Sequence, residues 1–306
     1  MPWSTSDIPN LSALHVVITG ATSGLGQVSA HVLASHGAQI TLAVRNLEAG
    51  EAVAASIRKT TPSAKASVRK VDLTSLASVR TFSRLLTEQE QTIDVLLNNA
   101  GVMRGPRRVT EDGFELQFGT NFLGHFALTG LLLPALSDRG RVVTVSSIEH
   151  RPGHIDFDDL MGQDSYNSRG AYQQSKLAQT VFGLELNRRL IAVQSPVISV
   201  LAHPGVAKSN LATQGANRFE ALMVKIVTAL IAQPTESGAL PQLRASTDPA
   251  AAGGLFYGPT GRGEMRGPVG MVRPSEEAVD PGVGNRLWSI AQELTDISYL
   301  DGSLAY

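Results

Sequence analysis

The sequence predicts an α/β fold: a single doubly wound parallel sheet of about seven strands with helices on both faces. Short runs rich in β-branched residues alternate with segments whose apolar residues recur every three or four positions. The first of these runs passes directly into a glycine-rich turn and then into a helical pattern. With 306 residues and 42% hydrophobic content, the chain can bury one large core.

Seven runs are candidate strands of this sheet. They are His15–Thr19, Gln39–Val44, Ala66–Val71, Ile93–Asn98, Arg141–Ser146, Val197–Ala202 and, as a last strand, Gly253–Tyr257. Between them, Leu25, Val28 and Val32 form one helical stripe, and Asn285–Thr295 predicts a terminal helix. Alternating strands and helices predict right-handed βαβ units. The Gly- and Pro-rich region Gly258–Pro281 is predicted to lack regular structure.

Composition excludes several classes of function. The net charge is −1 and no basic block occurs, so we expect no nucleic-acid partner. Cysteine is absent, which excludes disulfides and thiolate catalysis. Residues 1–10 lack the features of a signal peptide, and the longest apolar stretch, Ala221–Ala232, is shorter than the roughly 20 residues of a membrane span. We expect one domain, residues 1–306, soluble and cytoplasmic, with no integral membrane segment.

A metal site is not expected either. His150 and His154 have a helical spacing, but Pro152 and Gly153 between them disfavour a helix. We therefore predict that both are loop histidines.

The turn after the first strand carries the pattern of a nucleotide-binding loop. It reads Thr19-Gly20-Ala21-Thr22-Ser23-Gly24-Leu25-Gly26. Glycines let the backbone turn sharply and let a pyrophosphate approach, while the following helix offers N–H groups and partial positive charge. The spacing differs from G-x-G-x-x-G, and a plain tight turn also uses glycine. The position between strand and helix favours cofactor contacts from Gly20, Ser23, Gly24, Leu25 and Gly26.

The end of the second strand favours NADP(H) over NAD(H). Enzymes that use NAD place an acidic residue here to hold the ribose 2′-hydroxyl. This chain has Arg45 at the turn and no acid before Glu48. A guanidinium can bind a 2′-phosphate through charge-assisted hydrogen bonds, although a solvated surface arginine would look the same in the sequence.

Tyr172 and Lys176 form a candidate acid/base pair. Residues four apart share one face of a helix. A free phenol has a pKa of about 10, and a nearby ammonium favours its phenolate. The pair therefore predicts a general acid/base that works near neutral pH.

Together these motifs resemble the short-chain dehydrogenase/reductase family. The matching residues are Gly20, Gly24 and Gly26 in T-G-x-x-x-G-x-G, the segment Asn98-Asn99-Ala100-Gly101, and Tyr172 with Lys176, and they extend over about residues 13–210. The resemblance implies a Rossmann-type domain, a nicotinamide dinucleotide and a homo-oligomer. Its function would be to interconvert an alcohol and a carbonyl, by hydride transfer with Tyr172 as the proton donor.

The resemblance also assigns catalytic roles beside Tyr172. Ser147, the second serine after the fifth strand, would hydrogen-bond the substrate oxygen, whereas Ser146 suits a strand-end role. Lys176 would bind the nicotinamide ribose, and Asn121 would hold a water linked to it. His125 is expected to be a packed or hydrogen-bonded neighbour.

Further cofactor contacts follow from the same resemblance. Asp72 and Leu73 would contact the adenine, although a place near a helix N-cap also explains Asp72. Asn99, Ala100 and Gly101 would pack behind the cofactor. The remaining predicted contacts, on the nicotinamide side, are Pro204, Gly205, Val206 and Ser209.

The substrate is predicted only as a class. The long separation of Ser147 and Tyr172 and the Asn121–Phe126 segment resemble the retinol-dehydrogenase and protochlorophyllide-reductase-like branch, whose members often take lipophilic molecules. Residues 206–247 are the predicted lid over such a substrate. The lack of cysteine excludes light-driven pigment reduction. The alternative function is a dinucleotide-bound sensor or scaffold without turnover, which typically lacks part of the catalytic set.

Overall fold

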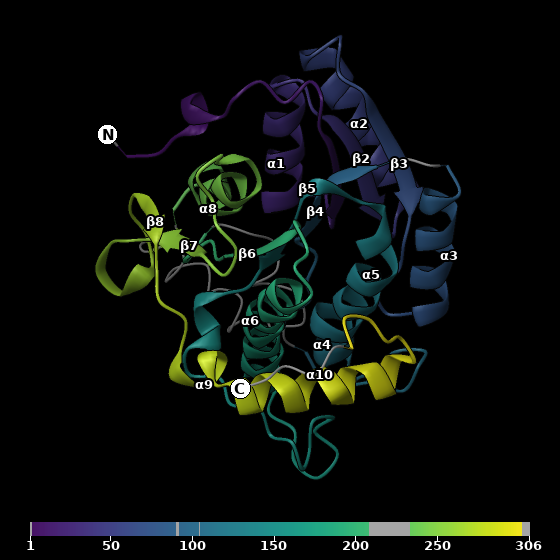
Figure 1. Cartoon of the computed structure of the whole chain (residues 1–306), viewed down its shortest axis with the longest axis vertical. Helices are drawn as coiled ribbons and strands as arrows, with labels where there is room; N and C mark the ends of the chain where they lie inside the picture. The colour runs from purple at the N-terminus through teal and green to yellow at the C-terminus, as the bar shows by residue number, and fades with distance from the viewer. Residues whose placement is uncertain (1, 90–91, 104, 208–232, 302–306) are drawn as a thin grey trace.

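The sheet has the strand order of a doubly wound fold (Figure 1). The computed structural model describes residues 2–89, 92–103, 105–207 and 233–301. Within them, eight strands form one sheet in the order β3-β2-β1-β4-β5-β6-β7-β8. The strands are β1 (His15–Thr19), β2 (Gln39–Val44), β3 (Ala66–Lys70), β4 (Ile93–Asn98), β5 (Leu136–Val145), β6 (Ile198–Ala202), β7 (Phe256–Pro259) and β8 (Val269–Met271). All neighbouring pairs are parallel except β7 and β8.

The fold class is therefore confirmed, with local differences. The candidate last strand lies a few residues later than predicted, as β7. The region Gly258–Pro281 is not irregular throughout, since it contains β8, a 3-10 turn η6 (Arg262–Glu264) and the short helix α9 (Glu276–Val279). β8 is an edge strand of three residues in which only Val269 is buried, so it has too little hydrophobic pattern to be recognised. β5 starts at Leu136 rather than Arg141, in a polar, partly exposed stretch.

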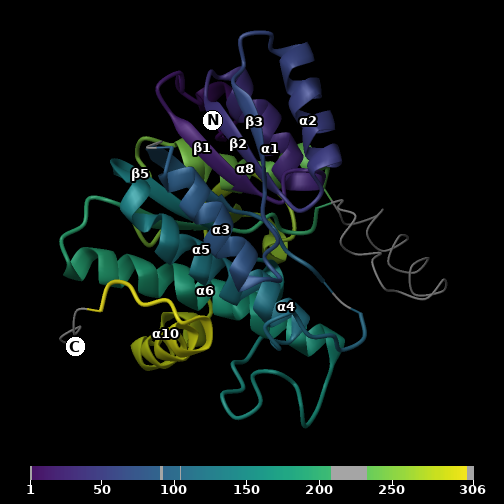
Figure 2. The ribbon, with the colours of Figure 1, turned by 90° about the vertical axis from the view of Figure 1, so that its right-hand side faces the viewer.

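Helices cover both faces of the sheet (Figure 2). The helices of one face are α1 (Gly24–Ser35), α2 (Leu47–Thr60) and α8 (Thr235–Thr247). Those of the other face are α3 (Leu76–Thr87), α4 (Leu116–Phe118), α5 (Gly124–Leu132), α6 (Ser168–Ala192) and α10 (Pro281–Thr295). Alternate residues of one strand serve the two cores: Val17 packs with the second group, Val16 and Ile18 with the first.

The predicted lid segment is in part a core helix. Residues 235–247 form α8, which packs against α1, and Ala239 and Leu243 are fully buried. Gln242 also donates a hydrogen bond to Ser29 on α1. This part of the segment therefore belongs to the scaffold, and residues 208–232 lie outside the described residues. None of the helices in the described ranges combines the length and the hydropathy needed to cross a bilayer.

The last helix packs against α6, which carries Tyr172 and Lys176, and against α5, which directly follows the turn that carries Asn121. Trp288 of α10 contacts Phe126 of α5 and Phe182 of α6, with ring centroids 5.0 and 6.0 Å apart. Tyr299 adds a contact at 4.9 Å to Phe126. Aromatic pairs in this geometry are worth about 0.5–1.5 kcal/mol beyond their buried area. In the ribbon, α10 crosses beneath α6 and packs against it (Figure 2).

A buried ion pair fixes this contact. Glu185 of α6 is fully buried, and its carboxylate lies 2.7 Å from Nε of Arg189, one turn along the helix. The same guanidinium donates to Asn285 of α10 and to the carbonyl of Leu300, and it stacks on Trp288 at 4.5 Å. One arginine therefore connects α6 with α10 and the segment after it.

We predict that Arg189→Ala destabilises the protein far more than Arg84→Ala. Both arginines pair with a glutamate four residues away on one helix, but the Arg84–Glu88 pair is exposed. Loss of Arg189 leaves the buried Glu185 carboxylate with Arg188 as its remaining partner and removes the hydrogen bonds to Asn285 and Leu300. We expect this to cost about 3 kcal/mol, whereas the exposed pair is worth about 0.5 kcal/mol. Urea unfolding of the two variants measures the difference, and equal losses would contradict the role assigned to Arg189.

Candidate active site

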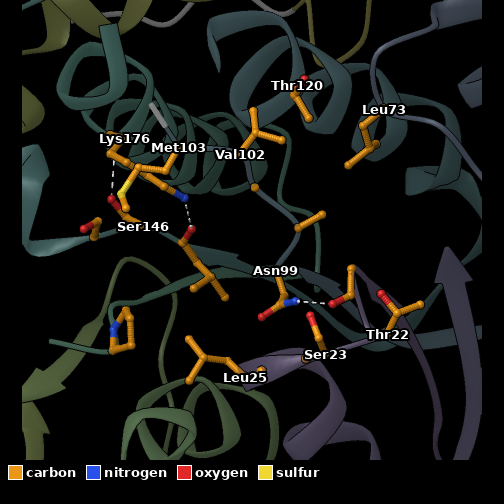
Figure 3. A pocket seen from close by; sticks show the side chains of 18 of the residues that line it. Thr22, Ser23, Leu25, Leu73, Asn99, Val102, Met103, Thr120, Ser146 and Lys176 are labelled. Atoms are coloured by element: carbon orange, nitrogen blue, oxygen red, sulfur yellow. Dashed lines mark hydrogen bonds between the residues drawn. The ribbon is translucent and has the colours of Figure 1, made fainter. Parts of the chain in front are cut away.

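A cavity opens at the carboxyl ends of the strands, at the point between β1 and β4 where the strand order reverses. Its volume is about 720 Å³. Thr22, Ser23 and Leu73 line one end, whereas Lys176, Ser146 and Met103 line the other (Figure 3). The predicted site residues in its wall are Gly20, Ser23, Gly24, Leu25, Gly26, Arg45, Asp72, Leu73, Asn99, Ala100, Gly101, Ser147, Tyr172, Lys176, Pro204, Gly205 and Val206. Ser209 lies outside the described residues.

The glycines of this turn leave bare backbone at the cavity wall. Gly20 has φ +67° and Gly24 φ +55°, which L residues with side chains rarely adopt. Ser23 is the extended N-cap residue of α1, so the first turn of that helix starts at the cavity wall. A Cβ on Gly26 would lie 2.5 Å from both Nδ2 of Asn99 and the carbonyl of Gly20. The free N–H groups of a helix start and a bare backbone suit an anionic pyrophosphate.

Thr19 joins this turn to β4 and α5. Its hydroxyl accepts hydrogen bonds from the backbone N–H groups of Asn99 and Ala100, both at 3.0 Å. It lies 3.0 Å from Nε2 of His125, whose Nδ1 lies 2.8 Å from the carbonyl of Asn121. A carbonyl only accepts, so Nδ1 carries the proton and Thr19 donates to Nε2. The expectation that His125 is a hydrogen-bonded neighbour agrees with this geometry, whereas the linking role of Thr19 was missed.

Asp72 lies both in the turn that precedes α3 and in the cavity wall. Oδ1 accepts from the backbone N–H and the hydroxyl of Thr74, at 3.0 and 2.8 Å. Ser75, not Asp72, is the N-cap of α3. Asp72 and Leu73 also line the cavity, at the end opposite the catalytic residues. A contact with a bound adenine remains compatible with this arrangement and stays a prediction.

The two serines after β5 have different environments. Ser146 is 2% exposed, and its hydroxyl donates to the backbone carbonyl of Lys176 at 2.9 Å. The same hydroxyl lies 2.8 Å from the hydroxyl of Thr180. Ser147 begins a one-turn helix, η4 (Ile148–His150), and accepts from the N–H of Glu149 at 3.2 Å. Both contribute to the cavity wall, but the hydroxyl of Ser146 is engaged in anchoring α6. The structure therefore agrees with Ser147 as the serine that faces a substrate.

Tyr172 and Lys176 lie on the same face of α6, near the helix start. The Nζ atom of Lys176 is 5.9 Å from the centre of the Tyr172 ring. It donates to Oε1 of Gln179 at 2.7 Å and to the carbonyl of Val145 at 3.2 Å. Lys176 is only 4% exposed, and this burial lowers its pKa from 10.5 to about 7. Gln179 was not predicted, because one more polar residue on a long helix carries no distinctive sequence signal.

Asn121 lies beneath the cavity, in the π-helical turn η2 (Gly119–Leu123), and does not itself line the wall. Its amide donates to the carbonyl of Val102 and to the hydroxyl of Ser175, and its Oδ1 accepts from the N–H of Val102 at 2.7 Å. A Cβ on Gly101 would lie 3.3 Å from this Oδ1 and 3.4 Å from Nζ of Lys176. Asn121 and Lys176 are thus neighbours across Gly101. The predicted water between them remains a prediction.

The wall near Tyr172 also contains an ion pair that sequence reasoning missed. Glu149 accepts from Arg169 at 3.2 and 3.3 Å and from Gln173 at 2.6 Å. Arg169 and Glu149 both line the cavity, next to the apolar side chains of Met103 and Ile148. The contact joins η4 to the start of α6 across a loop without helix or strand, and the sequence has no periodic pattern there that would predict it.

The two histidines examined for metal binding are not a pair. His150 ends η4 and is fully buried, which corrects the loop prediction for this residue. His154 is exposed and lies 3.0 Å from a carboxylate oxygen of Glu277. In the described part of the chain, no group of three potential ligands could hold a metal ion.

The fold and the site together define the class of protein. A parallel sheet with a glycine turn after β1, and a tyrosine–lysine pair at the same edge, are the features of a Rossmann-type oxidoreductase that uses a nicotinamide dinucleotide. The chain belongs to the short-chain dehydrogenase family, whose model matches residues 14–218. Within that family it falls in the retinol-dehydrogenase-like branch.

Comparison with individual proteins supports this assignment. The chain is 40% identical to retinol dehydrogenase 13 of Homo sapiens over 291 residues, 92% of this chain and 84% of the relative. It is 39% identical to polyprenol dehydrogenase of Mus musculus over 287 residues, 91% of this chain and 83% of the relative. Among solved structures, an uncharacterized protein from Mycobacterium paratuberculosis superimposes with a TM-score of 0.81 at 41% identity, covering 97% of this chain and 98% of that one.

We predict that stability falls as the pH drops from about 6.5 to about 4, in part because of His125. Burial lowers the pKa of His125 and of His150 to about 4. Between these pH values the unfolded histidines bind protons that the folded ones do not, so acid favours unfolding. His125→Gln should remove about 1.4 kcal/mol per pH unit from the pH slope of the free energy of unfolding.

Urea unfolding at several pH values from 6.5 to 5 measures this slope. His154→Gln is the control, because it makes the same substitution at an exposed histidine outside the core. An unchanged slope in His125→Gln would show that His125 does not resist protonation in the folded protein.

Proposed function

We propose that this protein is an NADP(H)-dependent oxidoreductase that interconverts a carbonyl and an alcohol, with Tyr172 as general acid/base. The observation that carries the proposal is the arrangement of one continuous cavity. Ser147, Tyr172 and Lys176 line it at one end, and the glycine turn with Arg45 lines the other. A nicotinamide bound there supplies or accepts the hydride.

The chain's own residues contribute orientation and proton transfer. During reduction, the Tyr172 hydroxyl donates its proton to the substrate oxygen, which Ser147 holds through a hydrogen bond. Lys176 binds the ribose beside the ring and favours the tyrosinate left behind. Its own pKa of about 7 lets it exchange protons near neutral pH. Asn121 and an associated water return the proton to Tyr172, and oxidation runs in the opposite sense.

Arg45 supports the preference for NADP(H). It is exposed directly after β2, lines the cavity, and precedes Asn46, the N-cap of α2. An exposed guanidinium at this rim can meet a 2′-phosphate without first giving up a buried partner. Arg45 does not repel NAD(H). The preference for NADP(H) therefore comes from the added attraction between the guanidinium and the 2′-phosphate.

A lipophilic substrate fits the reacting end of the cavity. Val102, Met103 and Ile148 provide apolar wall beside Tyr172. Two relatives that share about two fifths of their residues with this chain are named for retinol and polyprenol, both lipophilic alcohols. We retain a single domain of residues 1–306, with a lid in the part of residues 206–247 outside α8, a cytoplasmic location and a homo-oligomer as predictions.

We expect Tyr172→Phe to abolish turnover and leave cofactor binding intact. The substitution removes only the hydroxyl that transfers the proton, and removal of a general acid typically costs about 10²–10⁴-fold in rate. Turnover of medium-chain aldehydes, ketones, retinoids and steroids with NADPH measures activity, and protein fluorescence measures NADPH binding. Tyr166→Phe is a matched control, because Tyr166 bonds Glu115 and Gln117 away from the catalytic helix face.

A fully active Tyr172→Phe would refute the mechanism. A wild type that binds NADPH and turns over no carbonyl or alcohol would instead favour a dinucleotide-bound sensor or scaffold.

We expect Arg45→Ala to weaken NADPH binding by about tenfold or more and to leave NADH binding unchanged, because only the former carries the 2′-phosphate. Fluorescence titration with both cofactors measures the change. Lys59→Ala, which removes one exposed cation from the far end of α2, controls for net charge. Wild-type protein that binds the two cofactors equally would defeat the role given to Arg45.

A further inference from the structure

Glu264 is held in a backbone conformation that a glutamate rarely adopts. It ends the 3-10 turn η6, between β7 and β8, with φ +55°. Such a conformation costs a non-glycine residue free energy and persists only where the surroundings impose it. The contacts of the side chain therefore need an explanation beyond the turn itself.

The Glu264 carboxylate contacts two side chains from different segments, the guanidinium of Arg151 and the imidazole of His203. Oε1 lies 2.6 Å from Nη2 of Arg151, and Oε2 lies 3.3 Å from Nε of the same guanidinium. Oε2 also lies 3.1 Å from Nε2 of His203, which is fully buried. Partial burial raises the pKa of Glu264, but the hydrogen bonds from His203 and Arg151 outweigh it and hold the pKa at about 2. The carboxylate is therefore charged at every pH at which the protein is used.

The hydrogen bonds of His203 determine its tautomer. The backbone N–H of Gly205 donates to Nδ1 at 3.2 Å, so Nδ1 carries no proton. Burial lowers the pKa of His203, so the ring is neutral and Nε2–H donates to Glu264. Glu264 thereby orients the imidazole that holds the backbone of Gly205.

The backbone beside Glu264 also supports the same loop. The N–H of Val206 donates to the carbonyl of Met265 at 2.8 Å. Gly205 has φ +61°, and a Cβ there would lie 2.5 Å from that carbonyl. Residues 264–265 thus form the outer support of Pro204, Gly205 and Val206, which line the reacting end of the cavity.

Arg151 connects Glu264 to the turn that begins at Ser147. It is the C-cap residue of η4, whose N-cap is Ser147. His150, between them, lies with Nδ1 2.7 Å from the carbonyl of Ser147, and Arg151 donates to the carbonyl of Arg273 at 2.6 Å. Movement of the Glu264 carboxylate would therefore shift both the Pro204–Val206 wall, through His203, and the turn that begins at Ser147, through Arg151.

We propose that Glu264 is a positioning residue that fixes the Pro204–Val206 wall against the turn that carries Ser147. It acts through His203 on one side and Arg151 on the other, and it does not touch substrate. The proposal rests on the proposed function, since the nicotinamide ring must lie between these walls if Tyr172 and Ser147 are to act together. Glu264 makes none of these contacts at the adenine end of the cavity, near Leu73.

The test compares two ligands that differ in the half that reaches these walls. NADPH spans the cavity, whereas 2′,5′-ADP fills only the adenine end. In Glu264→Gln, an amide cannot accept from both His203 and Arg151 without facing one of them with its own N–H groups. We expect NADPH to bind about tenfold more weakly, from the loss of one charge-assisted hydrogen bond, and 2′,5′-ADP to bind as before. Fluorescence titration and calorimetry measure the two affinities.

Three further variants keep the test decisive. Glu276→Gln removes an exposed carboxylate from α9 of the same C-terminal region and should change neither affinity. Glu264→Gly tolerates the positive φ, so it should fold and still show the selective loss of NADPH affinity. His203→Asn keeps an acceptor for Gly205 and loses the contact with Glu264, and it should reproduce the effect of Glu264→Gln.

Each other outcome has a distinct meaning. Normal NADPH affinity in Glu264→Gln and Glu264→Gly would overturn the proposal. Equal weakening of both ligands would also overturn it, because it would indicate a general effect on folding. A wild type that binds 2′,5′-ADP but not NADPH, or neither, would refute the proposed function itself and the positioning role with it.

Discussion

The burial of the Lys176 ammonium constrains the end of the cavity where we propose that the reaction takes place. A charge taken out of water is tolerated only where polar groups replace the lost solvent. Here the replacements are neutral oxygens, one from the end of β5 and one from the next turn of α6. The end of a central strand and the start of a 25-residue helix must therefore meet within hydrogen-bond distance. The same burial lowers the pKa of Lys176 to about 7. The constraint on the fold and the proton exchange that we propose for this lysine therefore have one cause.

Several contacts outside the cavity maintain this meeting point. The Thr19–His125–Asn121 hydrogen bonds connect the glycine turn to the π-turn beneath the lysine. Ser146 attaches the end of β5 to the backbone of Lys176 itself. On the opposite side, the Glu149–Arg169 pair joins the serine turn to the first turn of α6. Neutral hydrogen bonds thus fix the buried part of the site, and ion pairs fix the part that solvent reaches.

Much of this could be read from the sequence because its signals are local. Six strands, the glycine turn and the four-residue spacing of Tyr172 and Lys176 each follow from neighbouring residues, and seventeen of the predicted site residues line one cavity. The features that were missed depend on contacts between distant segments. Gln179 and Thr19 are ordinary residues until the fold places them beside Lys176 and Asn99. β8 was missed because three edge residues have almost no hydrophobic pattern, and the positive φ of Glu264 has no counterpart in a sequence rich in glycine and proline around it.

The packing of α10 has a consequence for the order in which the molecule matures. Residues 281–301 are synthesised more than a hundred positions after Tyr172 and Lys176, yet Trp288 packs on aromatic side chains of both α5 and α6, and Tyr299 packs on Phe126 of α5. Before that late segment is made, Phe126 and Phe182 have each other and Phe122 as aromatic neighbours but lack the cover of Trp288. The contacts of α10 with α5 and α6 would therefore be among the last to form during synthesis.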